Sequence, residues 1–380
     1  MATVLLAGGF GNGNPADEAL LEAFKAALPG TRLSAITWDP AGTRERHGCD
    51  PVPASNPVAI ARAVARTDAT VLCGRSVFGH PPPFAGRRPS RRVAASLALL
   101  LTARARAKPR AVVGATVDPL PTPLARRLAR GVVRWSDLLV LREDESVDAL
   151  AAAGAAGPFR IGADPTWTVI APAWEAAGRN RGDPDRDRGR IVVALGPPAA
   201  GAPALEKLAA TLEQIGRAGL EVVLQPWQPR SARGPDDVDL ARYVADRLDP
   251  RPQIAAPPTD LLAARSSFAR CGLVVGLRYH ALIASAAAGV PFLTLEDRPE
   301  LVGLARRLDQ PVASAGASPE EVAQAILRGI DHPAPHRAAI QAQVTAAAEG
   351  LRLLRLLTSG GHSDDADRVS GLRLEPEPQA

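Results

Sequence analysis

Short apolar runs alternate with amphipathic segments along almost the whole chain, and this alternation constrains the fold more than any other feature. Runs typical of strands are Thr3–Ala7, Arg32–Thr37, Ala69–Cys73, Arg110–Ala115, Leu138–Leu141, Ile191–Leu195, Glu221–Leu224, Leu273–Gly276 and Pro291–Leu295. Segments typical of helices are Ala16–Leu28, Pro57–Arg66, Ser90–Ala107, Thr122–Trp135, Ala202–Ala218, Val238–Leu248, Asp260–Arg270 and Ala281–Ala288. Because the strand-like runs are largely apolar on both faces, we predict parallel sheets covered by helices on both sides.

The chain is long enough for two such units. Its 380 residues exceed what one ordinary hydrophobic core supports. Residues 175–190 are polar, charged and without hydrophobic periodicity, so we predict an interdomain linker there. The predicted fold class is α/β, with two Rossmann-like domains at residues 1–174 and 191–357 facing each other across a cleft. The polar segment 358–380 is predicted to be a disordered tail.

Composition narrows the function classes. The net charge of +5 favours anionic partners, but aromatic residues make up only 4% of the chain, too few to stack nucleic-acid bases. Cys49, Cys73 and Cys271 are scattered, which indicates neither a disulfide framework nor a zinc site. The sequence shows no signal peptide and no apolar stretch of membrane-spanning length. We therefore expect a cytoplasmic protein.

The first motif, Gly8 to Phe24, joins a glycine-rich turn to the start of a helix. Glycines such as Gly11 let backbone N–H groups approach an anion closely, and the helix N-terminus adds its dipole. The glycine spacing is not that of a dinucleotide site. We predict that Asn14 or Asp17 faces a ligand, and the alternative is that these residues only cap the helix.

Further polar residues follow strand-like runs. Arg142 either contacts a ligand or pairs with acids at the next helix start, such as Asp144, and Asp164 follows another expected strand end. The sequences leading to Arg75 and to Arg278 are alike, each an apolar strand followed by an arginine. This similarity either places one arginine on each wall of the cleft or is chance in an arginine-rich chain.

The sharpest motif is Leu273 to Pro291, in which Arg278 and His280 interrupt an otherwise apolar segment. A cation and an imidazole are costly to bury without partners, and Glu296 is the nearest acid that follows. We interpret Arg278 as an anion clamp and His280 as a general acid or base, since Arg offers a fork of donors and His titrates near neutrality. The alternative is a purely structural pair.

The region Ala69–Val117 has no acidic residue and nine basic ones. These are Arg75, Arg87, Arg88, Arg91, Arg92, Arg104, Arg106, Lys108 and Arg110. We expect this segment to form either a solvated basic face or a docking surface. The docking surface would bind a pyrophosphate or the inner face of an anionic membrane.

Taken in order, these motifs resemble the polysaccharide pyruvyl transferases. The resemblance covers residues 1 to about 310 and includes Asn14–Glu18, Arg142–Ser146, Asp164–Pro165 and Arg278–His280. It implies a glycosyltransferase-B-like pair of Rossmann-like domains. It also implies transfer of the enolpyruvyl unit of phosphoenolpyruvate to a sugar of a cell-wall or exopolysaccharide precursor, giving a pyruvate ketal and phosphate.

The resemblance assigns roles to residues. Arg278, His280 and Asp17 are expected to be catalytic, and the expected substrate-binding residues are Asn14, Arg142, Arg75, Gly11 and Asp164. No metal or organic cofactor is required, and the acceptor is expected on a lipid or nucleotide carrier. Two alternatives stay open, a nucleotide-sugar-dependent glycosyltransferase and a non-catalytic homologue that binds a glycan precursor.

The chain departs from the family pattern at three places. Ala16 stands where the family usually has Gly, and the segment Cys73 to Gly79 replaces a glycine-rich strand end. Glu300 stands where a Lys is expected, which reverses one charge of the anticipated anion site.

Overall fold

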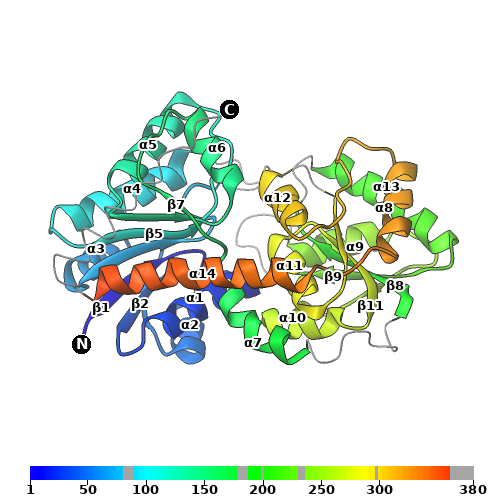
Figure 1. Cartoon of the computed structure of the whole chain (residues 1–380), viewed down its shortest axis with the longest axis horizontal. Helices are drawn as coiled ribbons and strands as arrows, with labels where there is room; N and C mark the ends of the chain where they lie inside the picture. The colour runs from blue at the N-terminus through cyan, green and yellow to red at the C-terminus, as the bar shows by residue number, and fades with distance from the viewer. Residues whose placement is uncertain (80–89, 178–186, 198–200, 230–235, 296–297, 360–380) are drawn as a thin grey trace.

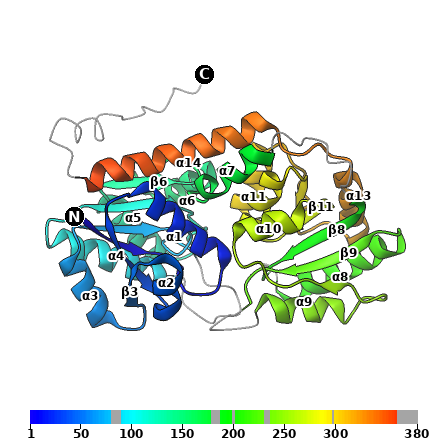
Figure 2. The ribbon, with the colours of Figure 1, turned by 90° about the horizontal axis from the view of Figure 1, so that it is seen from below.

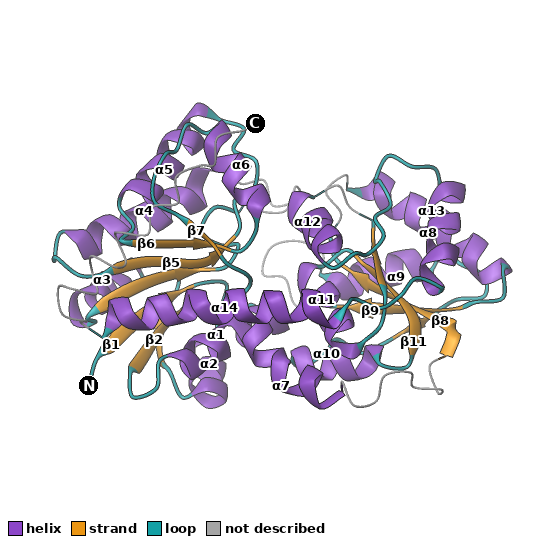
Figure 3. Cartoon of the chain, viewed as in Figure 1, coloured by secondary structure: helices purple, strands orange, loops and turns teal. Residues whose placement is uncertain are grey.

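The computed structural model describes residues 1–79, 90–177, 187–197, 201–229, 236–295 and 298–359. It contains two parallel β-sheets flanked by helices (Figures 1 and 3). The seven-stranded sheet has the order β3-β2-β1-β4-β5-β6-β7 and the five-stranded sheet the order β10-β9-β8-β11-β12. The α/β class and the two Rossmann-like units predicted from the sequence are thus confirmed.

The strands of the first sheet are β1 Thr3–Ala7, β2 Arg32–Thr37, β3 Asp50–Pro53, β4 Ala69–Cys73, β5 Arg110–Ala115, β6 Leu138–Leu141 and β7 Arg160–Ile161. Those of the second are β8 Asp187–Leu195, β9 Glu221–Pro226, β10 Gln253–Ile254, β11 Cys271–Gly276 and β12 Phe292–Thr294. Every pair of neighbouring strands is parallel. All carboxyl ends of one sheet therefore meet at a single edge, where ligands bind in such sheets.

Helices cover both faces of the first sheet. The helices of this part of the chain are α1 Pro15–Ala27, α2 Pro40–His47, α3 Pro57–Arg66, α4 Ser90–Arg104, α5 Pro123–Arg134, α6 Asp144–Ala152 and α7 Trp167–Ala177, of which α7 packs mainly on the second unit. Side chains of α3 to α6 share a core with one face of the sheet, and those of α1 share a core with the other. Asn14, Asn56 and Thr122 begin their helices as N-caps, each accepting a hydrogen bond from a backbone N–H of the first turn.

The second sheet is covered in the same way. Its helices are α8 Ala202–Arg217, α9 Asp237–Ala245, α10 Leu261–Phe268, α11 Tyr279–Ala288, α12 Pro299–Arg307 and α13 Pro319–Ile330. Helices α8, α9 and α13 pack on one face, and α10 to α12 pack on the other. Helix α11 is buried almost all round, which explains its uniformly apolar sequence.

The last helix, α14 Arg337–Thr358, runs along both units (Figures 1 and 2). Its Ile340 and Ala347 join the core of the second sheet, whereas Leu351 and Leu354 join the core under β1, β4, β5 and β6. Helix α7 likewise packs with α11 through Trp167. Helix α7 of the first half of the chain thus packs on the second unit, and α14 of the second half packs partly on the first. The exact domain boundaries stay a prediction.

The structure differs from the expected elements mainly where strands are exposed or contain proline. Strand β8 begins at Asp187, inside the predicted linker, and the pattern missed its first residues because they are polar and exposed. Of that linker, residues 178–186 lie outside the described part of the chain, as do residues 360–380 of the predicted tail. Strand β3 escaped the pattern because it is short and includes Pro51 and Pro53. In the described ranges, no helix is long and apolar enough to cross a membrane.

Candidate active site

A cavity of about 1370 Å³ lies between the carboxyl ends of the two sheets. Many of the polar residues that line it follow a strand. Asn14, Asp17, Arg75, Asp118, Arg142 and Asp164 come from the first sheet, and Gln228, Arg278, His280, Arg298 and Glu300 come from the second. Seven of the eight residues predicted for the site, all but Gly11, therefore line one cavity.

The centre of this wall is the contact between His280 and Asp164. Nε2 of His280, at the start of α11, lies 3.2 Å from Oδ2 of Asp164, which follows β7. The other partners of Asp164 are Arg142 at 3.0 Å and the backbone N–H and hydroxyl of Thr166. Burial acts to raise the pKa of Asp164, but His280 and Arg142 hold it well below its usual range. Asp164 is thus a fixed carboxylate that orients the imidazole.

Asp17 lies close to this pair, on the first turn of α1. Burial raises the pKa of its carboxyl to about 6, against the opposing charges of His280 and Arg278. Gly9 allows this position, because a Cβ there would meet Oδ2 of Asp17 at 2.5 Å. A carboxyl that titrates near neutrality beside a histidine suits proton transfer.

Arg278 is held by an acid that the sequence did not suggest. Its Nη2 donates to both carboxylate oxygens of Asp237, at 2.5 and 2.7 Å, while Asp237 also accepts from the backbone N–H groups of Trp227 and Gln228. Among the described residues, Nε of Arg278 has no hydrogen-bond partner. Gly196 lets the guanidinium lie against the end of β8, since a Cβ there would clash with Nε. Asp237 therefore aims the guanidinium.

For Arg142, the sequence left open whether the side chain contacts a ligand or pairs with nearby acids. It is 3% exposed, pairs with Glu143 at 2.7 Å and with Asp164 at 3.0 Å, and lies 3.9 Å above the ring of Tyr279. It also lines the cavity, so it is both ion-paired and open to a ligand. Asp144 is not its partner and lies 3.7 Å from Arg307 instead.

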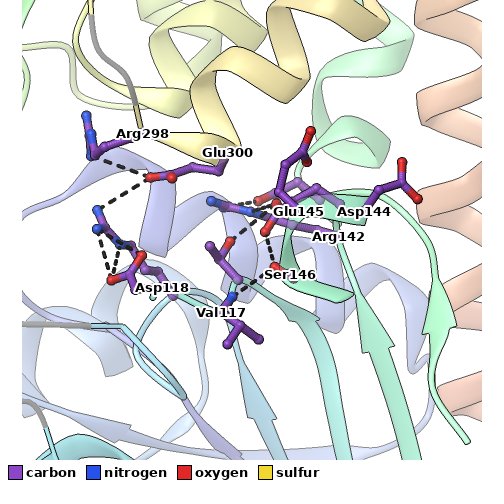
Figure 4. A network of polar contacts seen from close by, with 12 residues as sticks. Val117, Asp118, Arg142, Asp144, Glu145, Ser146, Arg298 and Glu300 are labelled. Carbon is purple, nitrogen blue, oxygen red and sulfur yellow. Dashed lines mark hydrogen bonds and ion pairs between the residues drawn. The ribbon is translucent and has the colours of Figure 1, made fainter. Parts of the chain in front are cut away.

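Glu300 lies between arginines of the two sheets (Figure 4). Its carboxylate is 3.8 Å from Arg75 and 3.6 Å from Arg298, and only 4% of the residue is exposed. Arg75 also forms a forked contact with Asp118 after β5. The negative charge at position 300 thus stands among cations, and Arg298 is a further guanidinium that sequence reasoning missed.

The glycine-rich turn is fixed by a buried network behind it. Glu18 accepts a hydrogen bond from the N–H of Gly11 at 2.9 Å and lies 2.6 Å from Nε2 of His47, whose Nδ1 lies 2.5 Å from Glu22. Gly11 has a φ of 75°, and a Cβ there would also clash with Thr37. Gly11 is accordingly a turn residue. It does not line the cavity within the described residues.

The basic residues of Ala69–Val117 do not act as one group. Arg75 faces the cleft, Lys108 donates to three backbone carbonyl groups, Arg110 pairs with Asp137, and Arg104 stacks on Trp135. Arg91 and Arg92 begin α4, whereas Arg87 and Arg88 lie outside the described residues.

Among the residues that the structure describes, no group of three or more His, Cys, Asp and Glu residues is arranged to hold a metal ion.

Comparison with known proteins gives a family and a fold. A family model described as polysaccharide pyruvyl transferase matches residues 81–297, more than half of the chain. The match spans Arg142, Asp164, Arg278 and His280. No curated protein matches the sequence.

Solved structures with the same architecture include several UDP-GlcNAc 2-epimerases. That of Methanocaldococcus jannaschii, described in complex with UDP-GlcNAc and UDP, is 12% identical, with a TM-score of 0.64 over 95% of this chain and 100% of that one. That of Rickettsia bellii is 11% identical, with a TM-score of 0.61 over 98% and 100%. Anabaena Alr3699/HepE, in complex with UDP and glucose, is 13% identical, with a TM-score of 0.58 over 98% and 100%. At these identities the likeness establishes the glycosyltransferase-B-like fold alone.

Proposed function

We propose that this chain, which belongs to the polysaccharide pyruvyl transferase family, moves the pyruvyl unit of phosphoenolpyruvate onto two hydroxyl groups of a sugar and releases phosphate. The observation that carries the proposal is the His280–Asp164 pair beside Asp17, surrounded by arginines from both sheets. The acceptor is a sugar of a cell-wall or exopolysaccharide precursor. We place the reaction in the cytoplasm, where phosphoenolpyruvate is produced.

The arginines suit the donor. Phosphoenolpyruvate bears a phosphate ester and a carboxylate on the same carbon, so a site for it needs several cations at short separation. Arg75, Arg142, Arg278 and Arg298 all line the cavity, and Nε of Arg278 has no hydrogen-bond partner within the part of the chain that the structure describes. Guanidinium groups bind such oxygen pairs bidentately, which fixes the orientation of the donor as well as its affinity.

The proton transfers can be assigned to named groups. His280 gives a proton to the methylene carbon of the donor, and the adjacent carbon accepts the first sugar hydroxyl as Asp17 takes the hydroxyl proton. The carbon–oxygen bond to phosphate then breaks, and the phosphate leaves with the proton that Asp17 had taken. The second hydroxyl bonds to the same carbon and gives its proton to His280, which restores both groups. The products are a cyclic pyruvate ketal and phosphate, so atoms and charges balance without a redox partner.

The surroundings of His280 support its role as the acid. Asp164 orients the imidazole through its contact with Nε2, and the low pKa of Asp164 keeps that carboxylate charged. Asp17 has a pKa of about 6, which lets it accept a proton near neutrality. Asn14 and Gln228 add neutral hydrogen-bonding groups to the wall, where sugar hydroxyls would lie.

A second candidate is a glycosyltransferase that uses a nucleotide sugar. Solved structures of this fold are described with UDP, UDP-GlcNAc or glucose, and the cavity extends beside α8 of the second sheet at Lys207 and Thr211. That reaction would release a nucleoside diphosphate in place of phosphate. The third reading is a homologue that binds a glycan precursor without turnover.

One experiment separates the three. The protein is incubated with phosphoenolpyruvate and sugar acceptors, and in parallel with nucleotide sugars alone, while phosphate and nucleoside diphosphate are measured. Phosphate release that depends on both substrates, with a ketal detected by mass spectrometry, is the expected result. Release of nucleoside diphosphate without phosphoenolpyruvate would favour the second candidate, and binding of acceptor without either product would favour the third.

A further inference from the structure

The cavity is also lined by residues of α3 and α4 that the proposed reaction does not use, and we call this part of it the α3–α4 arm. From α3 it is lined by Pro57, Ile60, Ala61 and Val64, which occupy one face of the helix at successive turns. Each of these side chains is apolar. Leu72 of β4 is buried beneath them and also lines the cavity.

The opposite wall of the arm is a matching face of α4. Its lining residues include Ala95, Ala98, Leu99 and Thr102, again at helical spacing. From Arg92 to Thr102 the lining residues span eleven residues of helix, a length of about 15 Å at the helical rise. An apolar passage of that length fits a hydrocarbon chain and offers a sugar or a nucleotide almost no hydrogen-bonding groups.

The arm meets the polar site at its arginine-rich part. The hydroxyl of Ser96 donates to the carbonyl of Val77 at 3.0 Å, which ties the first turns of α4 to the segment that follows Arg75. Arg92, one turn before Ser96, and Arg75 both line the cavity here. A ligand with its sugar near His280 and a hydrocarbon chain in the arm would therefore place a linking phosphate beside guanidinium groups.

The surface outside the arm is complementary to an anionic bilayer. Helices α3, α4 and α5 lie on one face of the first sheet and contain no acidic residue. They carry nine arginines, namely Arg62, Arg66, Arg91, Arg92, Arg104, Arg126, Arg127, Arg130 and Arg134. Each helix also exposes one large aliphatic side chain, Val58 at 56%, Leu101 at 40% and Leu124 at 56%. Basic groups with exposed aliphatic side chains suit a membrane surface better than stacked nucleic-acid bases.

We propose that the α3–α4 arm binds the hydrocarbon chain of a lipid-phosphate-linked sugar acceptor, presented by an anionic membrane on which α3, α4 and α5 dock. This inference rests on the proposed function and names the carrier of its acceptor. It concerns binding and involves no chemical step beyond the transfer already described.

The arm is tested with farnesyl phosphate as the probe and inorganic phosphate as its chain-free counterpart, both titrated calorimetrically into the full chain. Ala98→Trp and Ala61→Trp place a large side chain in the arm from its two walls. Ala105→Trp, at an exposed position just beyond α4 that does not line the cavity, is the matched control. We expect farnesyl phosphate to bind at least about tenfold more tightly than inorganic phosphate, and either arm variant to remove that advantage. Equal binding of the two probes, or unchanged farnesyl phosphate binding in both arm variants, would overturn the proposal.

The docking surface is tested with vesicles of phosphatidylcholine containing phosphatidylglycerol, and with pure phosphatidylcholine vesicles. The triple variant Arg62→Glu, Arg66→Glu, Arg127→Glu should lose binding to the anionic vesicles. A control with the same charge change, Arg188→Glu, Arg217→Glu, Arg251→Glu, alters exposed arginines of the second half and should retain it. Equal loss in both variants would mean attraction by net charge alone and would overturn a specific docking face. Binding to duplex DNA but not to the anionic vesicles would also overturn the proposed docking face.

Phosphoenolpyruvate binding is measured in each variant, which keeps the two proposals apart. The arm variants should bind phosphoenolpyruvate as the unmodified chain does. If farnesyl phosphate fails to bind while phosphoenolpyruvate binds and phosphate is released with a water-soluble sugar, the arm proposal is wrong and the proposed function stands. If phosphoenolpyruvate does not bind at all, the proposed function fails, whatever the vesicles show.

Discussion

The 3.2 Å contact between Nε2 of His280 and Oδ2 of Asp164 joins residues that belong to different sheets. His280 follows β11 and Asp164 follows β7, so this pair exists only while the two units face each other. A motion that opens the cleft would separate the imidazole from its carboxylate. Opening of the cleft and the orientation of His280 are therefore coupled in this fold.

Replacing His280 by Gln should leave phosphoenolpyruvate binding nearly unchanged and lower turnover roughly 10²–10⁴-fold. The amide keeps much of the size of the side chain but cannot deliver a proton. Arg278→Lys is the contrasting change, because it keeps the charge and loses the fork. It should mainly weaken donor binding, by on the order of 1.5–3 kcal/mol. Steady-state kinetics and calorimetric titration of the donor check both, and wild-type turnover in the glutamine variant would make His280 structural.

Replacing Asp164 by Asn should lower both turnover and stability. The amide cannot replace the carboxylate that orients His280, so turnover should fall. Arg142 also loses one of its two buried partners, which costs about 1–3 kcal/mol in the free energy of unfolding. Asp144→Asn is the matched control, since Asp144 has a side chain that is 65% exposed and pairs with Arg307 at the surface. The free energies of unfolding of the two variants, measured in denaturant, should differ clearly. Equal values would show that Arg142 does not need the Asp164 carboxylate.

Asp17 should produce an acidic limb in the pH dependence of turnover. Its pKa is raised to about 6, so the carboxyl is protonated and inactive as a base below that pH and becomes competent as the pH rises through it. Asp17→Asn should remove the limb and most of the turnover. The limb should persist in Asp144→Asn. A limb that survives in the Asp17 variant would assign it to another group.

The pair formed by Glu18 and His47 should make stability depend on pH in two directions. Burial acts to lower the pKa of His47, but its hydrogen bonds to Glu18 and Glu22 raise it above the ordinary value of 6.5. This stabilisation is complete below that ordinary value and is lost as the pH rises through the folded-state pKa. Burial acts to raise the pKa of Glu18, but His47 and the N–H of Gly11 lower it below 4.5. Its contribution is present above 4.5 and is lost as the pH falls through the folded-state pKa.

Urea unfolding as a function of pH checks this pair. His47→Gln should cost on the order of 1.5–3 kcal/mol at about pH 6 and much less at about pH 9. The same cost at both pH values would mean that packing, and not charge, stabilises the turn at Gly11.

Replacing Glu300 by Gln should tighten phosphoenolpyruvate binding. The carboxylate lies within 4 Å of two arginines that line the cavity, so removing its charge raises the positive potential that a donor meets. The binding free energy of phosphoenolpyruvate should become more favourable by on the order of 1 kcal/mol, and this difference should shrink at high salt. Weaker binding would instead mean that Glu300 is required to hold Arg75 and Arg298 in place.

The sequence predicted the elements that bear the site because strand ends are marked by a change from apolar to polar residues. Arg278, Arg142 and Arg75 each stand within two residues of a strand end. Parallel strands bring such positions to one edge, so the pattern alone was enough to gather them. The same local signal predicted the bounds of β1, β2 and β4 as the structure has them.

The partners of these side chains could not be predicted, because they come from distant segments. Asp237 lies 41 residues before Arg278 and occupies a helix start, where an acid is expected for capping alone. His47 contacts Glu18 from a short polar helix with no apolar periodicity. Long-range pairing of charges depends on how the sheets face each other, and that information is not local.

The path of α14 has a consequence for how the protein is made. The face of the first sheet that contains Val4, Val71 and Val140 is covered by Leu351 and Leu354, which are synthesised after the whole second unit. On the ribosome, the first unit therefore emerges with part of its core exposed and stays unfinished until translation reaches the last helix. Such a nascent chain is open to aggregation or chaperone capture over most of its length. A nonsense codon just before residue 337 would leave both units without a shared helix, so even a late truncation should produce an insoluble product.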